Sequence, residues 1–101
     1  MIFIKTKIIN YLKSKNINTS ILNDGIKFSI GVDTFVLFVK NEVNKQAEIL
    51  LLHKNTFNPN RNHKNKIYFD LIDYHLQKDF GKTDDPISCV NYALKHQYKW
   101  K

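Results

Sequence analysis

Hydrophobic residues are densest between residues 26 and 52, where long stretches alternate between hydrophobic and polar positions. Residues 26–30 read Ile-Lys-Phe-Ser-Ile, a period of about two that predicts a strand with one buried face. Residues 35–39 are all hydrophobic, so a strand there must be covered on both faces. Residues 47–53 supply a third hydrophobic run. The pattern predicts a small antiparallel sheet with residues 34–40 as its central strand.

A helix is predicted ahead of this sheet, at residues 3–15. Ile4, Ile8 and Leu12 recur at helical spacing, and the lysines of this segment lie largely on the opposite side. The alternative is that residues 1–6 begin as a strand, because isoleucine and phenylalanine are good strand formers. We take the helix as the primary prediction.

Asp24-Gly25 is the strongest local signal in the chain. An Asp-Gly pair supplies the positive φ values that a two-residue type I′ turn requires between paired strands. Residues 17–21 alternate between hydrophobic and polar, which predicts a short edge strand before this turn. Residues 41–46 are predicted to be a polar connection between the second and third hydrophobic runs.

Two further helices are predicted after an asparagine-rich loop at residues 54–65. Hydrophobic residues return at helical spacing from Lys66, and Gly81 is placed to end that helix. The buried stripe of this helix would be Tyr68, Leu71, Ile72, His75 and Leu76. Asp85 before Pro86 then predicts the start of a last helix, because Asp accepts hydrogen bonds at the N-cap and proline suits the first helical position.

The predicted fold is a single α+β domain over residues 1–101. It contains one small antiparallel sheet of three or four strands, packed by an N-terminal helix and two C-terminal helices. No internal repeat or linker divides the chain. A length of 101 residues is typical of one domain with its own core.

The charge of the chain points to a polyanionic partner. Sixteen Lys and Arg against nine Asp and Glu give a net charge of +7, and the pI is about 9.5. This balance favours nucleic acid or a nucleoprotein complex as the partner. The alternative is that the abundance of Lys, Asn and Ile reflects an AT-rich coding sequence, in which case part of the charge only solvates the surface.

Several function classes are disfavoured by composition. The longest hydrophobic run is too short to cross a bilayer, and no secretory signal precedes residue 26, so we expect a cytoplasmic protein with no membrane partner. The single cysteine, Cys89, cannot form an internal disulfide and is interpreted as a packing residue. No cofactor and no metal site are predicted.

The first candidate site is a basic segment that follows the sheet. No carboxylate occurs between Glu48 and Asp70, and the segment leads into a predicted helix N-terminus, where backbone amides attract phosphate. The predicted nucleic-acid-binding residues are Lys54, Arg61, His63, Lys64 and Lys66. The alternative is a solvated loop whose charge has no partner.

The second candidate site is the C-terminal segment, in which aromatic residues alternate with lysines. Such a pattern suits base stacking with phosphate contacts, or insertion of a tryptophan into a protein partner. The predicted partner-binding residues are Lys95, Lys99, Trp100 and Lys101. The alternative is that the aromatic rings fold back over the sheet while the lysines stay in water.

Three function hypotheses follow. The first is a small, non-enzymatic protein that binds nucleic acid through its phosphates. The second is a protein-binding inhibitor or adaptor of phage or mobile-element type, which occupies an acidic surface on a host enzyme such as a defence nuclease. The third is a metal-dependent nuclease, because His53, Asn62 or Asn65, and His75 loosely resemble the His-Asn-His nucleases. No Asp stands beside His53 in the sequence, and His75 falls on a predicted hydrophobic helix stripe, so catalysis is the least favoured of the three.

Overall fold

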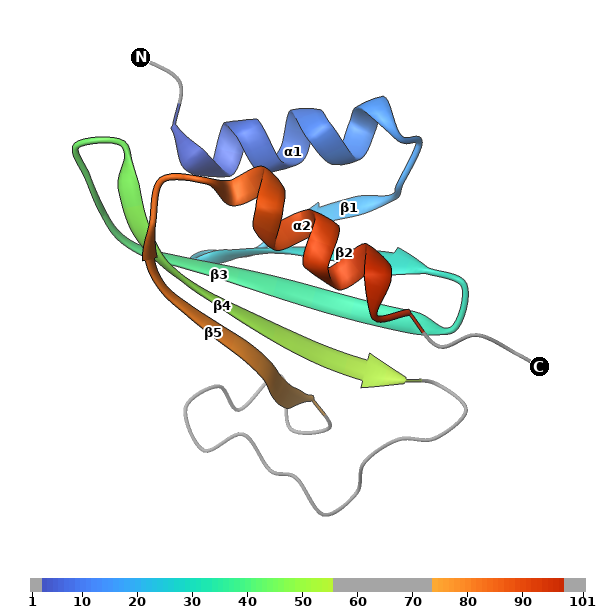
Figure 1. Cartoon of the computed structure of the whole chain (residues 1–101). Coiled ribbons are helices and arrows are strands. Elements are labelled where there is room, and N and C mark those ends of the chain that lie inside the picture. The colour runs from blue at the N-terminus through green and yellow to red at the C-terminus, as the bar shows by residue number, and fades with distance from the viewer. Residues whose placement is uncertain (1–2, 56–73, 98–101) are drawn as a thin grey trace.

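The computed structural model describes residues 3–55 and 74–97, which form one antiparallel sheet and two helices (Figure 1). The elements are α1 (Ile4–Ser14), β1 (Thr19–Ile21), β2 (Gly25–Ile30), β3 (Asp33–Val43), β4 (Gln46–Asn55), β5 (His75–Thr83) and α2 (Pro86–Lys95). The five strands lie in the order β1-β2-β3-β4-β5, so each strand pairs with the next one in the sequence. The predicted class, α+β with a single antiparallel sheet, is confirmed.

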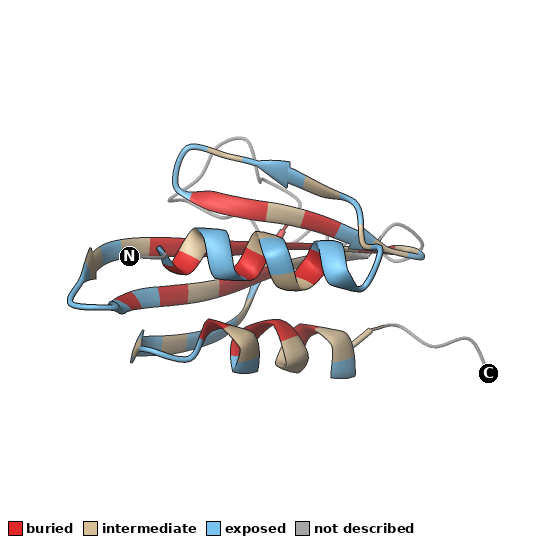
Figure 2. Ribbon diagram, turned by 90° about the horizontal axis from the view of Figure 1, so that it is seen from above, coloured by how far each residue is buried: buried red, intermediate tan, exposed pale blue. Residues whose placement is uncertain are grey.

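Both helices pack on the same face of the sheet. The hydrophobic stripes of α1 and α2 face inward, and their outer sides are exposed (Figure 2). Their buried residues join the sheet residues Ile26, Phe28, Phe35, Leu37 and Ile49 in one core cluster. Tyr11 Oη of α1 donates a hydrogen bond to Asn91 Oδ1 of α2 at 2.7 Å, which ties the helices together. In this core Phe28 and Phe35 stack with ring centroids 5.4 Å apart.

Strand β3 is the central strand, and it is buried on both faces as predicted. Phe35, Leu37 and Val39 belong to the core beneath the helices. Val36 and Phe38 point to the opposite face, where they form a second buried cluster with Leu52 and Tyr74. Residues 35–39 are all hydrophobic because neither face of this part of β3 is exposed to solvent.

The predicted helix over residues 66–81 is wrong for its second half. Residues 66–73 lie outside the described residues, but His75–Thr83 form the strand β5, paired with β4. Two register shifts, between Ile49 and Leu50 and between Leu51 and Leu52, interrupt the pairing. Each irregularity breaks the two-residue alternation, which hid the strand from a periodicity analysis. The sheet thus has five strands instead of three or four, and the described residues contain two helices instead of three.

The two helix starts differ in how they are capped. In α2, Asp85 Oδ1 accepts a hydrogen bond from Ser88 N at 3.1 Å, with Pro86 in the first turn, as predicted. In α1, Phe3 makes no side-chain cap; instead Glu42 of β3 accepts a hydrogen bond from Ile4 N at 3.1 Å. The sequence predicts this helix correctly, within one residue at each end, but not the distant residue that caps it. Neither of the described helices has the length and hydropathy needed to cross a membrane.

The hairpin at Asp24-Gly25 is present, but the predicted type I′ turn is wrong. Ile21 pairs with Ile26, and neither Asp24 nor Gly25 has a positive φ. Gly25 is the first residue of β2, where a Cβ atom would come within 2.8 Å of the carbonyl oxygen of Leu37. The glycine is needed for close approach of two strands, and not for a left-handed backbone.

The left-handed two-residue turn occurs instead between β3 and β4. Val43 pairs with Gln46, and the two residues between them, Asn44 and Lys45, have φ values of 54° and 65°. These are the positive φ values that a type I′ hairpin requires. Residues 41–46, predicted to be a polar connection, are therefore mostly strand and tight turn.

Replacing Lys45 by glycine is expected to raise the free energy of unfolding by about 1 kcal/mol, because a left-handed backbone is costly for lysine and not for glycine. The Lys45 side chain is exposed, so little packing is lost with it. Urea denaturation measures the change. Lys45→Ala, which removes the same charge but keeps the strain, is the control and is expected to change stability by less than half as much. A Lys45→Gly protein no more stable than Lys45→Ala would contradict the turn assignment.

Candidate functional site

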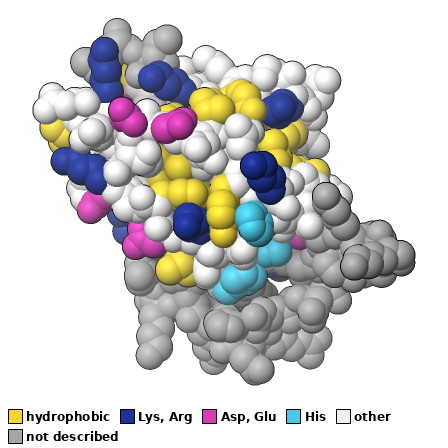
Figure 3. All heavy atoms as spheres, in the orientation of Figure 1, with side chains coloured by type: hydrophobic (Ala, Val, Ile, Leu, Met, Phe, Trp, Pro, Cys, Tyr) yellow, Lys and Arg dark blue, Asp and Glu magenta, His cyan; other side chains and the backbone are white. Residues whose placement is uncertain are grey.

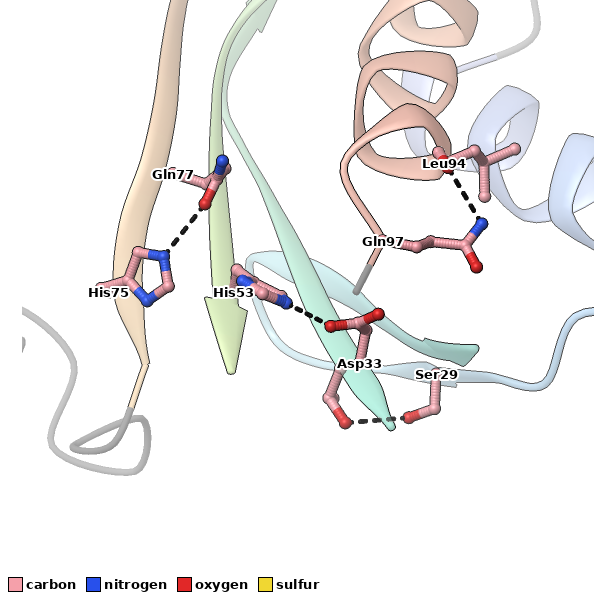
Figure 4. Close-up of polar contacts among 8 residues, drawn as sticks. Ser29, Asp33, His53, His75, Gln77, Leu94 and Gln97 are labelled. Carbon is pink, nitrogen blue, oxygen red and sulfur yellow. Dashed lines mark hydrogen bonds and ion pairs between the residues drawn. The ribbon is translucent and has the colours of Figure 1, made fainter. Parts of the chain in front are cut away.

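Polar and titratable side chains gather where β3 begins and where β4 and β5 meet. Asp33 starts β3, and His53 near the end of β4 pairs with His75 at the start of β5. These residues, together with Gln77, are called the histidine cluster below (Figure 4). His53 lies on the helix-covered face, because it stacks on the core residue Phe35. The cluster therefore lies at one end of the main core.

Asp33 and His53 form a largely buried, hydrogen-bonded pair. Asp33 is 1% exposed and is the only buried polar or charged residue among those the structure describes. Its Oδ1 lies 2.7 Å from His53 Nε2. An ionised carboxylate only accepts hydrogen bonds, so Nε2 carries the proton and donates it. The second ring nitrogen of a neutral His53, Nδ1, then has its lone pair available.

The His53 ring is held on several sides. It stacks on Phe35 with ring centroids 4.7 Å apart, and the centroid of the nearly perpendicular His75 ring lies 5.2 Å away. The His53 side chain keeps 12% of its surface exposed. Within the described part of the chain, Nδ1 has no hydrogen-bond partner, and it is not closed off from solvent. The ring is thus held in one orientation, and one of its nitrogens has no hydrogen-bond partner among the described residues.

His75 is oriented by its own strand. Its Nε2 lies 3.0 Å from Gln77 Oε1, and a side-chain amide oxygen is an acceptor, so Nε2 donates this hydrogen bond. The His75 ring lies nearly perpendicular to the His53 ring, with an interplanar angle of 80°. The predicted helical position of His75 is wrong, and the strand-then-helix arrangement expected of a His-Asn-His nuclease is not formed here, because His75 begins β5.

A second group of side chains lies across β5 and α2 on the same side of the sheet. Lys78 Nζ lies 5.3 Å from the centroid of the Tyr92 ring and 5.8 Å from that of Phe80. Tyr92 stacks on His96 at 4.0 Å. We call Lys78, Phe80, Tyr92 and His96 the lysine–aromatic strip. Figure 3 shows histidine side chains gathered on this face, beside lysines and hydrophobic side chains.

The structure places two of the predicted site residues. Lys54 is on β4, next to His53 but on the opposite face of the sheet, with Nζ 5.8 Å from the centroid of the Tyr74 ring. Lys95 is exposed in the last turn of α2. The other predicted residues, Arg61, His63, Lys64, Lys66, Lys99, Trp100 and Lys101, lie outside the described residues. Their placement stays a prediction.

Charge on the described residues is spread widely, with lysines on every element except β1. Of the described carboxylate oxygens, none lies within 4.0 Å of Lys54, Lys78 or Lys95. These three lysines therefore keep their charge available. Lys54 and Lys95 also stand near the points where the described chain stops, at Asn55 and at Gln97. Figure 4 shows Gln97, just after α2, near the start of β3 where Asp33 pairs with Asn55.

Sequence reasoning missed the partnership of Asp33 with His53. The turn at Asn44 and Lys45 alone would pair Phe35 with Lys54. The register shift between Lys40 and Val43 moves the pairing by one residue, so that Phe35 pairs with His53. Asp33 lies two residues before Phe35 on β3, so its side chain is on the same face of the sheet. The lysine–aromatic strip was missed because Lys78 and Phe80 were assigned to a helix and its end.

Cys89 takes no part in either group of side chains. It is 1% exposed and packs in the core beneath the helices. Burial, reinforced by the nearby Asp85 carboxylate, raises the pKa of the Cys89 thiol to about 11. The thiol is therefore protonated at neutral pH, which agrees with its interpretation as a packing residue.

Comparisons with known proteins give no family for this chain: no protein-family model, no curated protein and no solved structure matches it. Among the residues in 3–55 and 74–97, no group of three His, Cys, Asp or Glu side chains is arranged to hold a metal ion. The functional argument therefore depends on the two side-chain groups described above.

Proposed function

We propose that this protein binds nucleic acid, alone or within a nucleoprotein complex, through contacts to phosphates. The observation that carries the proposal is the lysine–aromatic strip, in which Lys78 lies against Tyr92 and Phe80 with no described carboxylate close enough to neutralise it. Lys95 adds a second exposed charge on α2. The net charge of +7 favours attraction of a polyanion from a distance.

The physical logic is that of single-strand and backbone recognition. Lysines release condensed counterions when they contact phosphates, and this release supplies much of the affinity. Aromatic rings beside the lysines exclude water from part of the protein surface and provide planar faces on which bases can stack. Lys54, Arg61, Lys64 and Lys66 are proposed to add further phosphate contacts, and Lys99 and Lys101 to extend the interface from the C-terminal side.

Binding to labelled single-stranded RNA, duplex RNA and duplex DNA, followed by fluorescence anisotropy at several salt concentrations, tests this proposal. Affinity is expected to fall steeply as salt rises. Replacing Lys78 and Lys95 together by glutamine is expected to reduce the slope of log affinity against log salt by about 1.5, because each lost contact removes about 0.7 to 0.9. Replacing Arg61, Lys64 and Lys66 together is expected to have a larger effect of the same kind.

The matched control replaces Lys7 and Lys13, two exposed lysines on α1, by glutamine. This control removes the same net charge and is expected to change the slope by less than half as much. Equal slopes for the two double variants would mean that the strip is not the contact surface. Negligible affinity for all three nucleic acids at low salt would overturn the proposal and would leave an acidic protein surface as the partner to seek.

A further inference from the structure

We infer that His53 is a catalytic base for cleavage of RNA, acting on the chain that the lysines bind. This inference rests on the proposed binding of nucleic acid and goes beyond it, because it adds a reaction. It is carried by the Asp33–His53 pair, in which the carboxylate holds one ring nitrogen and leaves the other accessible.

The tautomer of His53 is set by Asp33. The hydrogen bond of 2.7 Å keeps the proton on Nε2 and directs the lone pair of Nδ1 away from the carboxylate. A carboxylate in this position also stabilises the imidazolium that forms when Nδ1 accepts a proton. Asp33 is therefore a positioning residue, and His53 is the residue that would contact the substrate.

The ring is also kept from rotating. Phe35 lies on one face of His53, and the His75 ring, itself hydrogen-bonded to Gln77, stands at 80° to the His53 ring. A fixed base avoids the entropy loss of orienting the ring at each turnover. Such immobilisation also suits a purely structural ion pair, so the experiment must separate the two roles.

A lysine lies on the same face of the sheet as the base. Leu51 pairs with Lys78 and His53 pairs with His75, so Lys78 occupies the neighbouring position along the same two strands. Its contacts with Phe80 and Tyr92 place Lys78 on the helix-covered side of the sheet, where His53 also lies. A phosphate held by Lys78 would thus lie on the side of the sheet that presents His53, where the ammonium group can stabilise charge on the phosphate oxygens.

The reaction is an internal transesterification that RNA can undergo and DNA cannot. His53 Nδ1 accepts the proton of a ribose 2′-hydroxyl, and the 2′-oxygen forms a bond to the adjacent phosphorus. The bond from phosphorus to the 5′-oxygen of the next nucleotide breaks, and that oxygen takes a proton from water. The products are a 2′,3′-cyclic phosphate and a free 5′-hydroxyl, and His53 returns its proton to the resulting hydroxide. No oxidant or reductant is required.

The experiment incubates the full-length protein with short 5′-labelled single-stranded RNA, with DNA of the same sequence, and with RNA methylated on every 2′-oxygen. Binding is measured for each before cleavage products are separated on a gel. We expect the RNA to be cut to fragments ending in a 2′,3′-cyclic phosphate. The DNA and the methylated RNA are expected to be bound but left intact, because they lack the attacking hydroxyl.

His53→Gln is the central variant, because the glutamine amide can still donate a hydrogen bond to Asp33 but is not a base. It is expected to lower kcat by about 100-fold or more while RNA affinity stays within about twofold. His53→Gly is expected to regain activity when imidazole is added to the solution, a rescue that a merely structural histidine would not produce. Asp33→Asn is expected to lower kcat with KM unchanged, and circular dichroism verifies that each variant is folded.

RNA that is bound and never cleaved would overturn this inference and leave the proposed function intact. Undiminished cleavage by folded His53→Gln would assign the reaction to another centre and overturn the inference. Cleavage of the methylated RNA would do the same. Absence of binding to every nucleic acid would overturn both proposals together. Cleavage of RNA that is lost in His53→Gln and restored to His53→Gly by imidazole would establish His53 as the base.

Discussion

Phe35→Ala is expected to lower the free energy of unfolding by about 3 to 5 kcal/mol, the usual cost of removing a fully buried aromatic side chain. Phe35 is fully buried on β3 and stacks on Phe28 and on His53. Its loss leaves a cavity between the sheet and the helices that the paired strands cannot close. Because small domains are stable by only about 5 to 15 kcal/mol, much of the total stability is at stake. Urea denaturation followed by circular dichroism measures the loss.

Phe35→Leu is the matched control for this prediction. Leucine keeps most of the buried hydrophobic volume and is expected to cost less than half as much as alanine. Because Phe35 also supports the His53 ring, we further expect Phe35→Leu to lower RNA cleavage more than RNA binding. A Phe35→Ala protein destabilised by less than about 1 kcal/mol would contradict the central place of β3 in the core.

Gly25→Val is expected to destabilise the protein by about 3 kcal/mol, because the new side chain has no room. A Cβ atom at this position would lie 2.8 Å from the Leu37 carbonyl oxygen, and 3.4 Å from side-chain atoms of Val36 and Phe38. The closest of these atoms is backbone, so no rotamer change relieves the clash. Strand β2 would have to move away from β3, which breaks ladder hydrogen bonds. Thermal and urea denaturation measure the effect.

Gly31→Ala separates this clash from the general cost of replacing a glycine. Gly31 has a φ of 59°, and a Cβ atom there would meet nothing within 4 Å. The substitution therefore adds backbone strain of about 1 kcal/mol and no collision. If Gly25→Val and Gly31→Ala were equally destabilising, close packing of β2 against β3 would not be the reason for the glycine at position 25.

Local sequence patterns were reliable where one short-range cause dominates. The all-hydrophobic run at residues 35–39 predicted a strand buried on both faces, and β3 is such a strand. Asp85 and Pro86 predicted the start of α2, because a helix cap depends only on residues within the first turn. Asp85 supplies the hydrogen-bond acceptor, and Pro86 has a φ that suits the first helical position. The periodicity of α1 likewise follows from one hydrophobic stripe.

The same reasoning failed where two causes produce similar patterns. His75 and Leu76 fit a helical stripe, yet they begin a strand whose alternation is broken by register shifts. Asp24-Gly25 has the composition of a left-handed turn, yet the hairpin turn with two left-handed residues is the one at Asn44 and Lys45. In both cases the strand partner, and not the local sequence, determined the backbone conformation.

The candidate site was predictable only in part for the same reason. His53 and His75 were identified as the only histidines that could form a centre, and their pairing across β4 and β5 brings their rings to 5.2 Å. The contact with Asp33 depends on a hairpin register that composition does not reveal. Arg61, His63, Lys64 and Lys66 were predicted from their charge and from the helix N-terminus expected to follow them, and their placement stays a prediction.

By itself the sequence determined the class of the fold, the central strand, both described helices and the excess of positive charge, because these depend on composition and on spacing over a few residues. Only the tertiary structure decided that Glu42 caps α1 and that Gly25 packs closely against the Leu37 carbonyl oxygen. It also decided that Asp33, His53 and His75 meet at one end of the sheet. Each of these contacts joins residues on different elements. Their geometry is fixed by strand register and helix docking, which are properties of the whole packed chain.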